Sequence, residues 1–199
     1  MAKEWIKNYK HWIFLTGSWM CLFFFIFTFM NGLWHDIDCA VYAYFLSIRQ
    51  PVLTSLIKIM TYLGSAGFVI VLCLVGIVVK KSLGLILSLH MVILALINFV
   101  MKNIVMRPRP AYFPVIHEYG YSFPSFHAMM SMSLYGFIAY KLWKSHRLLA
   151  IVILTIPIIV GITRIYLGVH YASDVVAGWL ISLCYLSVLY FIHKNSSIS

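Results

Sequence analysis

Residues 82–101 read Ser-Leu-Gly-Leu-Ile-Leu-Ser-Leu-His-Met-Val-Ile-Leu-Ala-Leu-Ile-Asn-Phe-Val-Met, without an aspartate, glutamate, lysine or arginine. A helix needs about 20 mostly apolar residues to cross the hydrocarbon core of a bilayer, and this run has that length. Other apolar segments lie before and after it. The six predicted spans are residues 11–34, 59–79, 82–105, 124–143, a segment that ends near residue 166, and residues 169–193.

The composition of the whole chain agrees with this assignment. Of its 199 residues, 63% are hydrophobic and 10% are charged, whereas a soluble domain is about half apolar and about a quarter charged. So much apolar surface cannot be buried in a core of this size, so the surrounding solvent is lipid. We therefore predict an all-α, polytopic membrane protein with one integral-membrane domain over residues 1–199 and no separate soluble domain.

Basic residues predict the orientation of the chain. They precede the first span, lie between the second and third and between the fourth and fifth, and follow the sixth: Lys3, Lys7, Lys10, Lys80, Lys81, Lys141, Lys144, Arg147 and Lys194. By the positive-inside rule, both termini are cytoplasmic. The opposite face carries five basic residues that topology does not explain: Arg49, Lys102, Arg107, Arg109 and Arg164.

The sequence does not fit a nucleic-acid-binding protein or a protein with a cysteine-based metal or redox site. The net charge of +10 could suggest nucleic-acid binding, but most of it lies in the short flanks of apolar runs. The four cysteines have neither metal-ligand nor redox spacing, and we expect them to be ordinary core or lipid-facing residues. They are Cys21, Cys39, Cys73 and Cys184.

The first candidate site cluster lies at the outer end of the third predicted span. It contains Lys102 and the stretch Arg107-Pro108-Arg109-Pro110. Three cations within eight residues repel one another, which suggests an anion between them. Arginine matches phosphate with a planar fork, and lysine acts as a point charge. The alternative is that these side chains are snorkelling anchors at a helix end.

The second cluster, Phe123-Pro124-Ser125-Phe126-His127, opens the fourth predicted span. Proline and serine are favourable near a helix start, and free backbone N–H groups there bind anions. His127, one turn into the span, is placed to give or take a proton. The alternative is an ordinary helix cap with an interfacial histidine.

The third cluster runs from Thr163-Arg164 to His170 and Asp174. Ionisable groups at membrane depth are costly and usually pair at a functional site. If His170 lies in the first turn of the sixth span, Asp174 is one turn further along the same face. The carboxylate would then hold one imidazole nitrogen and leave the other as a nucleophile. The alternative is a buried polar pair that joins two helices.

Together the three clusters predict a site for phosphoryl transfer. Cations would hold the phosphate oxygens, Ser125 and backbone N–H groups would complete the cradle, His170 would attack phosphorus, and His127 would protonate the leaving oxygen. Among these residues Asp174 is the single carboxylate, whereas magnesium and calcium sites usually need more oxygen ligands. We therefore expect no metal and no other cofactor.

The spacing of these residues resembles that of a known family. Residues 102–110 fit lysine, six residues, Arg-Pro. Residues 124–127 resemble Pro-Ser-Gly-His, and residues 163–174 resemble Ser-Arg, five residues, His, three residues, Asp. In this order the motifs resemble those of the type 2 phosphatidic acid phosphatase (PAP2) family, also called lipid phosphate phosphatases. The motif core covers about residues 102–178, and the six predicted spans also match.

The resemblance implies a metal-independent mechanism through a phosphohistidine. By position, His170 is the nucleophile, Asp174 orients it, and His127 is the general acid. The residues implied to bind phosphate are Lys102, Arg109, Ser125, Phe126 through its backbone, and Arg164. Arg107 falls inside the six-residue spacer and is expected to have a supporting role.

Two positions depart from the family motifs. Thr163 replaces serine and keeps the hydroxyl. Phe126 replaces glycine, which allows positive φ and a close approach of the ligand. We expect Phe126 to shift the phosphate, narrow the pocket or stack against substrate. We expect specificity to be determined by the loop of residues 112–121, chiefly through Tyr112, His117 and Glu118.

The resemblance also suggests the substrate class. Small members of the family are commonly bacterial, and we expect a lipid phosphate substrate in the cell membrane, with the site facing the extracytoplasmic side. Undecaprenyl pyrophosphate is favoured, followed by phosphatidylglycerophosphate and phosphatidic acid. The alternative from another class is a catalytically silent lipid-phosphate binder or transporter. Phe126 favours that alternative, while His127, His170 and Asp174 favour an enzyme. The sequence predicts no oligomeric state.

Overall fold

The computed structural model describes residues 2–196, with side chains from Trp12 to Ile192. Its elements are α1 (Ala2–Met30), α2 (Trp34–Ser47), α3 (Pro51–Thr61), a 3-10 turn (Tyr62–Gly64), α4 (Ala66–Val79), α5 (Lys81–Val105), α6 (Phe126–Leu142), α7 (Arg147–Tyr166) and α8 (Ala172–Ser196). No strand forms within residues 2–196, so the all-α prediction is confirmed.

Four helices are long and apolar enough to cross a membrane. They contain the segments Trp12–Met30, Lys81–Val105, Arg147–Tyr166 and Ala172–Ile192. A fifth candidate is the pair Pro51–Gly64 and Ala66–Val79, which passes the same test together but is bent by 47°. As one span, this pair would begin before residue 59, the predicted start, and would be broken between its two helices. α6 has 17 residues, so six spans remain a prediction.

The break in the second candidate span has a local cause. Ser65 adopts an extended conformation, and its side-chain oxygen accepts the backbone N–H of Phe68 at 3.2 Å. This is an N-cap, which starts a new helix instead of continuing the old one. The chain therefore changes direction at Ser65 before it enters the strongly apolar α4.

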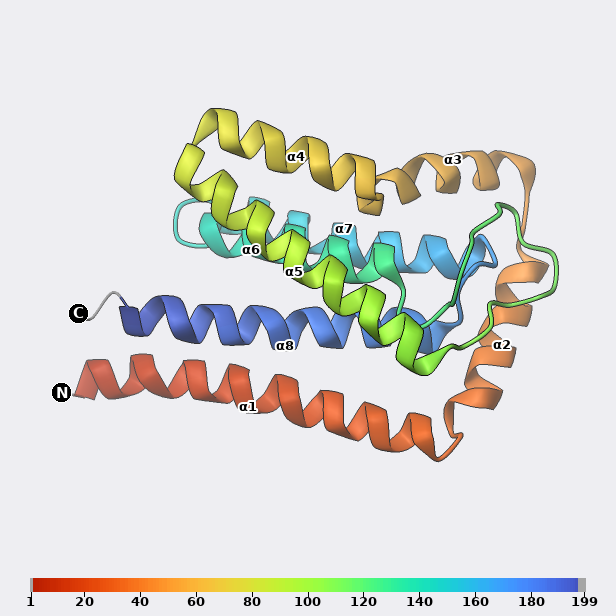
Figure 1. Cartoon of the computed structure of the whole chain (residues 1–199), viewed down its shortest axis with the longest axis horizontal. Coiled ribbons are helices and arrows are strands. Elements are labelled where there is room, and N and C mark those ends of the chain that lie inside the picture. The colour runs from red at the N-terminus through yellow and green to blue at the C-terminus, as the bar shows by residue number, and fades with distance from the viewer. Residues whose placement is uncertain (1, 197–199) are drawn as a thin grey trace.

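α6 lies at the centre of the helix bundle, between α5, α7 and α8 (Figure 1). Its buried side chains include Met129 and Leu134, both without exposed surface. Gly178 of α8 brings that helix close to the start of α6, because a Cβ there would lie 2.9 Å from the Ser125 carbonyl oxygen. This close contact joins the second and third sequence motifs.

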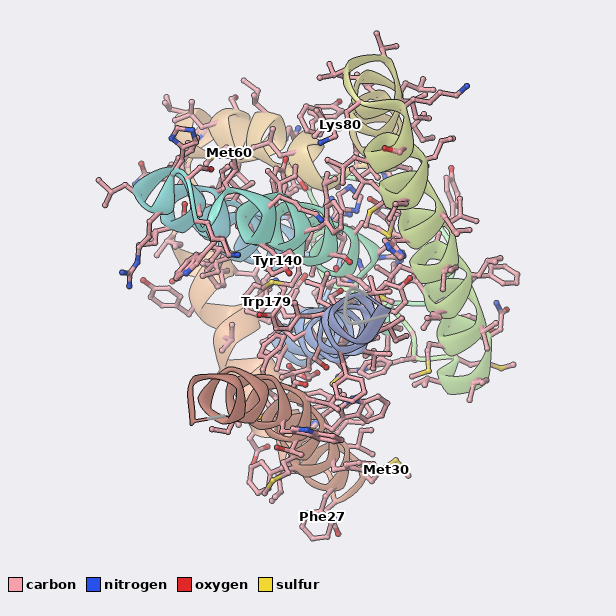
Figure 2. All side chains as sticks on the ribbon, turned by 90° about the vertical axis from the view of Figure 1, so that its left-hand side faces the viewer. Phe27, Met30, Met60, Lys80, Tyr140 and Trp179 are labelled. Carbon is pink, nitrogen blue, oxygen red and sulfur yellow. The ribbon has the colours of Figure 1, made fainter. Side chains whose placement is uncertain are left out.

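The outer surface of the bundle is apolar, as expected for a protein in lipid. On α1, the side chains of Phe24, Phe27 and Met30 are 70%, 63% and 78% exposed, and Figure 2 shows Phe27 and Met30 at the periphery. The beginning of α1 and the end of α8 lie at one end of the bundle (Figure 1). α2 and the loop of residues 106–125 lie at the other end, where the candidate site forms.

Candidate active site

The first sequence cluster lies where α5 ends. Lys102 is in the last turn of α5, and Met106 follows with a left-handed conformation, φ 48°. That turn directs the chain into the loop that carries Arg107 and Arg109. The Lys102 ammonium donates to the carbonyl oxygen of Tyr121, so the end of α5 is attached to the far side of the same loop.

The second cluster forms the start of α6. Ser125 occupies the N-cap position without a side-chain cap bond, and its buried Oγ has no hydrogen-bond partner among the residues that the structure describes. Its backbone N–H donates to the Asp174 carbonyl oxygen at 3.0 Å. The start of α6 is thereby attached to the first turn of α8. Phe126 and His127 follow in the first turn of α6.

The third cluster differs in one respect from the sequence prediction. α8 begins at Ala172, so His170 precedes the helix and does not lie in its first turn as predicted. Gly168, with φ +75°, allows the sharp turn after α7 that delays the start of α8. Asp174 is in the first turn of α8, and its Oδ2 lies 3.5 Å from His170 Nδ1. The same oxygen accepts the Tyr171 N–H at 2.9 Å.

The tautomer of His170 follows from its other ring nitrogen. His170 Nε2 lies 3.2 Å from Arg109 Nη1. A guanidinium donates and never accepts hydrogen bonds, so Nε2 carries the lone pair in this contact. The ring proton is then on Nδ1, which lies 3.5 Å from Asp174 Oδ2 and makes no hydrogen bond among the described residues. This is the arrangement that a nucleophilic Nε2 requires.

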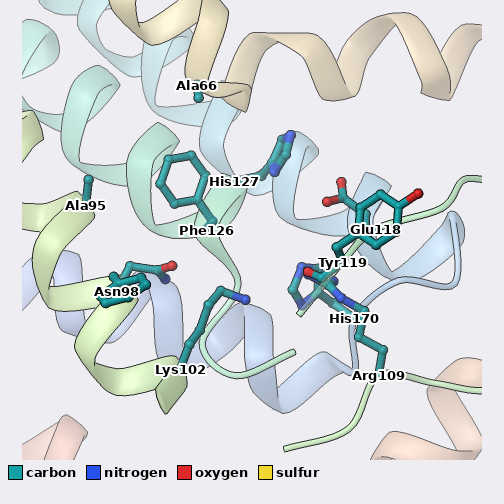
Figure 3. Close-up of a pocket in the computed structure, with 11 residues that line it drawn as sticks. Ala66, Ala95, Asn98, Lys102, Arg109, Glu118, Tyr119, Phe126, His127 and His170 are labelled. Carbon is teal, nitrogen blue, oxygen red and sulfur yellow. The ribbon is translucent and has the colours of Figure 1, made fainter. Parts of the chain in front are cut away.

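The three clusters meet at a cavity of about 460 Å³ (Figure 3). Its polar side is lined by Lys102, Arg109, Glu118, His127 and His170. Its other side is mainly apolar and is lined by Ala66, Ala95, Asn98, Phe99 and Phe126. A cavity of this volume is typical of a small-molecule site, and the division suits a ligand with a charged head and an apolar body.

Arg164 is held next to this cavity by an ion pair. Its side chain is 1% exposed, and it donates to the Glu118 carboxylate and to Thr61 Oγ1. Burial alone would raise the pKa of the Glu118 carboxyl, but the guanidinium of Arg164, together with that of Arg109, holds this pKa below its ordinary value. Glu118, which the sequence placed in a specificity loop, is therefore the anionic partner of a predicted phosphate-binding arginine.

Burial also lowers the pKa values of His170 and Arg109. Burial lowers the pKa of His170 to about 4, although Asp174 acts in the opposite direction. The imidazole is therefore neutral near pH 7. Burial lowers the pKa of Arg109 as well, against the attraction of Glu118 and Asp174. A guanidinium stays protonated in proteins, so Arg109 is a fixed positive charge beside a neutral histidine.

Arg107 does not line the cavity. It forms ion pairs with Asp38 at 2.7 Å and with Asp174 at 2.6 Å. Sequence reasoning missed Asp38, because α2 follows an apolar span as a short amphiphilic stretch without a motif. Its signal in the sequence was an acid in a chain that has only five carboxylates.

Three further residues of the predicted site lie away from the cavity that contains His127 and His170. Tyr112 lines a second cavity of about 320 Å³, together with Cys39, Tyr42 and other residues of α2 and the loop. His117 is exposed. The Thr163 hydroxyl donates to the Val160 carbonyl oxygen of its own helix at 2.6 Å. None of the three lines the cavity that His127 and His170 share.

Within the part of the chain that the structure describes, no three histidine, cysteine, aspartate or glutamate side chains gather as metal ligands. The positive charge around the cavity comes from Lys102, Arg109 and Arg164. Lysine and arginine side chains bind phosphate through charge-assisted hydrogen bonds.

The fold and the site define a multi-pass membrane protein with a cationic pocket that contains two histidines. Residues 83–198 match the sequence pattern of the PAP2 superfamily. The chain is 34% identical over 160 residues to phosphatidylglycerophosphatase B of Bacillus subtilis, which covers 74% of this chain and 77% of that protein. The chain therefore belongs to the PAP2 family of membrane phosphatases, which are phosphoric-ester hydrolases.

Two solved structures are also similar. One is the crystal structure of a transmembrane PAP2-type phosphatidylglycerolphosphate phosphatase from Bacillus subtilis, with a TM-score of 0.81 and 28% identity over 91% of this chain and 97% of that chain. The other is LpxE of Aquifex aeolicus, with a TM-score of 0.65 and 24% identity over 77% of this chain and 96% of that chain. The second likeness supports the fold.

Proposed function

We propose that this PAP2 phosphatase hydrolyses the phosphate monoester of phosphatidylglycerophosphate at the outer face of the membrane. The observation that carries the proposal is the cavity where Lys102, Arg109, His127 and His170 meet beside an apolar wall. The relative that is 34% identical is named phosphatidylglycerophosphatase B, which favours this substrate. Undecaprenyl pyrophosphate, favoured by the family resemblance, takes second place because neither the relative nor the two solved structures described above is named for that activity.

The proposed reaction has two steps. Nε2 of His170 attacks phosphorus, the bond between phosphorus and the lipid oxygen breaks, and His127 gives that oxygen a proton. Water then attacks the phosphohistidine, His127 takes a proton from the water, and inorganic phosphate leaves. The sum is phosphate ester plus water to lipid alcohol plus phosphate. Asp174 keeps the His170 proton on Nδ1 throughout.

The cations bind the phosphate in this proposal. Lys102 and Arg109 line the cavity, and Arg164 lies behind Glu118. The buried hydroxyl of Ser125, which has no hydrogen-bond partner among the described residues, and the first N–H groups of α6, including that of Phe126, are further donors. Such donors stabilise charge in the transition state without a metal. The proposed site is therefore metal-independent.

We also propose one domain with six spans over residues 1–199, with both termini in the cytoplasm and the site on the other face. The ends of α1 and α8 that lie together, opposite the site, agree with an even number of crossings (Figure 1). Reporter fusions at the 80–81 turn and within residues 111–119 test this topology. A cytoplasmic signal from the second fusion would contradict it.

The function is tested by phosphate release in detergent from phosphatidylglycerophosphate, undecaprenyl pyrophosphate and phosphatidic acid. Wild type is compared with His170→Ala and His127→Ala, each with and without a chelator. We expect release from phosphatidylglycerophosphate by wild type alone, unchanged by the chelator. Faster release from undecaprenyl pyrophosphate would reverse the order of substrates. If wild type releases no more phosphate than His170→Ala, the proposed phosphatase function fails, and the silent lipid-phosphate binder or transporter is the alternative.

A further inference from the structure

We propose that Asp38 is a positioning residue that holds the first and third sequence motifs together behind His170. The proposal rests on the proposed phosphatase function. Asp38 lies on α2, outside all three motifs, and does not line the cavity that contains His127 and His170. It acts through its contacts with Arg107 and Ser173.

The Asp38 carboxylate is 2% exposed and accepts three hydrogen bonds. Oδ1 accepts the backbone N–H of Ser173 at 2.8 Å, and Oδ2 accepts the Ser173 hydroxyl at 2.5 Å. Oδ2 also accepts from Arg107 Nη2 at 2.7 Å. Ser173 lies in the first turn of α8, where free N–H groups and the helix dipole favour a negative charge. Asp38 therefore caps α8 from a different helix.

Arg107 connects this cap to Asp174. Its Nη1 donates to Asp174 Oδ1 at 2.6 Å and to the Ser173 hydroxyl at 2.7 Å. The guanidinium carbon lies 4.1 Å from the centroid of the Tyr171 ring and 5.3 Å from that of Phe29. These cation–π contacts, with the two ion pairs, hold the guanidinium in one orientation.

The two oxygens of Asp174 therefore have separate partners. Oδ1 faces Arg107, while Oδ2 faces the Tyr171 N–H and His170 Nδ1. Without Arg107, Asp174 could rotate, and two buried carboxylates would lie near each other without a shared counter-ion. Such uncompensated buried charge is strongly destabilising.

The same contacts position the phosphate-binding side of the site. Arg107 is two residues before Arg109, which contacts His170 Nε2. A fixed Arg107 thus limits where Arg109 can lie. Asp38 consequently links the residue that orients the nucleophile to a residue that binds phosphate. A mutation outside the cavity that moves the reacting groups by about 1 Å can lower the rate about 100-fold.

The competing explanation is that Asp38 only joins α2 to α8. A purely structural ion pair would lower thermal stability, and Arg107→Lys would not differ from Arg107→Met in turnover per folded enzyme. A positioning role lowers kcat more than it changes KM. In that case kcat is also higher in Arg107→Lys than in Arg107→Met, because lysine keeps the positive charge but lacks the planar set of donors of arginine.

The first experiment measures kcat, KM and melting temperature for Asp38→Asn in detergent, on the lipid phosphate that wild type hydrolyses fastest. Asp36→Asn is the matched control, because Asp36 is an exposed acid on the same helix. We expect kcat of Asp38→Asn to fall about 10- to 100-fold with KM close to wild type, and Asp36→Asn to behave as wild type. Wild-type kcat in folded Asp38→Asn would overturn the proposal, as would equal kcat in Arg107→Lys and Arg107→Met.

Two further measurements test the proposal if Asp38→Asn does not fold or if wild type shows no turnover. Ser173→Ala removes one donor to Asp38 and keeps the backbone N–H, so it provides a milder variant if Asp38→Asn does not fold. We expect kcat of Ser173→Ala to fall by a smaller factor with KM unchanged, and wild-type kcat would overturn the proposal. Nitrogen-15 histidine spectra report the His170 tautomer without turnover. We expect Asp38→Asn and Ser173→Ala to change the His170 signals and to leave those of the exposed His35 unchanged.

These spectra separate the two hypotheses. If wild type releases no more phosphate than His170→Ala, the proposed function fails, whatever the spectra show. If both variants leave the His170 signals as in wild type, the positioning role of Asp38 fails, whatever the substrate is.

Discussion

Arg109 lies against His170, with 3.2 Å between Arg109 Nη1 and His170 Nε2. The same Nη1 donates to the Val169 carbonyl oxygen at 2.9 Å. The other two guanidinium nitrogens donate to the carbonyl oxygens of Tyr119 and Gly120, each at 3.1 Å. One side chain therefore joins the loop of residues 106–125 to the turn that carries the proposed nucleophile.

The first prediction concerns the shape of this side chain. Arg109→Lys keeps the positive charge but cannot make contacts on both sides of the fork. We expect kcat/KM to fall about 100-fold, and further in Arg109→Met, because the loss of one donor for transition-state charge typically costs that much. The control is Arg147→Lys, since Arg147 is an exposed residue of α7. Equal kcat/KM in Arg109→Lys and wild type would mean that charge alone is needed.

The second prediction concerns competition for Arg164. Its guanidinium is bound by the Glu118 carboxylate, so a phosphate must share or replace that anion. Arg164 holds the pKa of Glu118 below its ordinary value against the effect of burial, so the carboxylate is ionised near pH 7. We expect Glu118→Gln to lower the inhibition constant of inorganic phosphate several-fold, because the competing charge is removed. His117→Gln, a change at the exposed neighbour, should leave the constant unchanged, and a weaker inhibition in Glu118→Gln would show that Glu118 helps to bind phosphate.

The third prediction is a pH dependence of stability. Burial lowers the pKa of His170 to about 4 from its ordinary 6.5. Between these values the unfolded chain binds a proton that folded His170 does not, so stability falls as the pH decreases from 6.5 to 4. The shift corresponds to at most about 3 kcal/mol. The melting temperature of wild type should therefore fall more between pH 7 and pH 4 than that of His170→Ala, and equal decreases would contradict the low pKa.

Much of the site could be predicted from short-range spacing. Lys102 and Arg109 flank the end of one helix, and His127 opens another, so each motif fixes its own local geometry. The residues that sequence reasoning missed act over long range. Asp38 meets Ser173 across 135 positions, and no periodicity or motif in α2 indicates this contact. Glu118 meets Arg164 across 46 positions, in a loop where only its general role was expected.

The membrane spans show the same limit. Hydropathy predicts apolar segments, but not where a helix breaks or begins. Ser65 caps a new helix inside the second predicted span. Gly168 turns the chain sharply, so α8 starts at Ala172 and not at residue 169, where the sixth span was predicted to start. Each is a local effect of a single residue, and a hydropathy average over about 20 residues does not detect it.

The last prediction concerns Phe126, one of the two positions that depart from the family motifs. Phe126 lies in the first turn of α6, and its ring centroid is 6.2 Å from that of His127. It lines the apolar side of the cavity and also packs against the hydrophobic core. Phe126→Gly would widen the cavity beside the proposed general acid. It would also remove core packing at a cost of up to about 3 kcal/mol, because the ring is partly buried.

We therefore expect Phe126→Gly to have equal or higher kcat than wild type and a lower melting temperature. Phe126→Ala distinguishes the effect of a wider cavity from the effect of a more flexible backbone. It removes the ring but does not add the flexibility of glycine. If only Phe126→Gly turns over faster, backbone freedom near the phosphate limits the rate. If both variants lose most of their activity while they remain folded, the ring is part of substrate binding. Removal of the ring would then lower turnover although the cavity is wider.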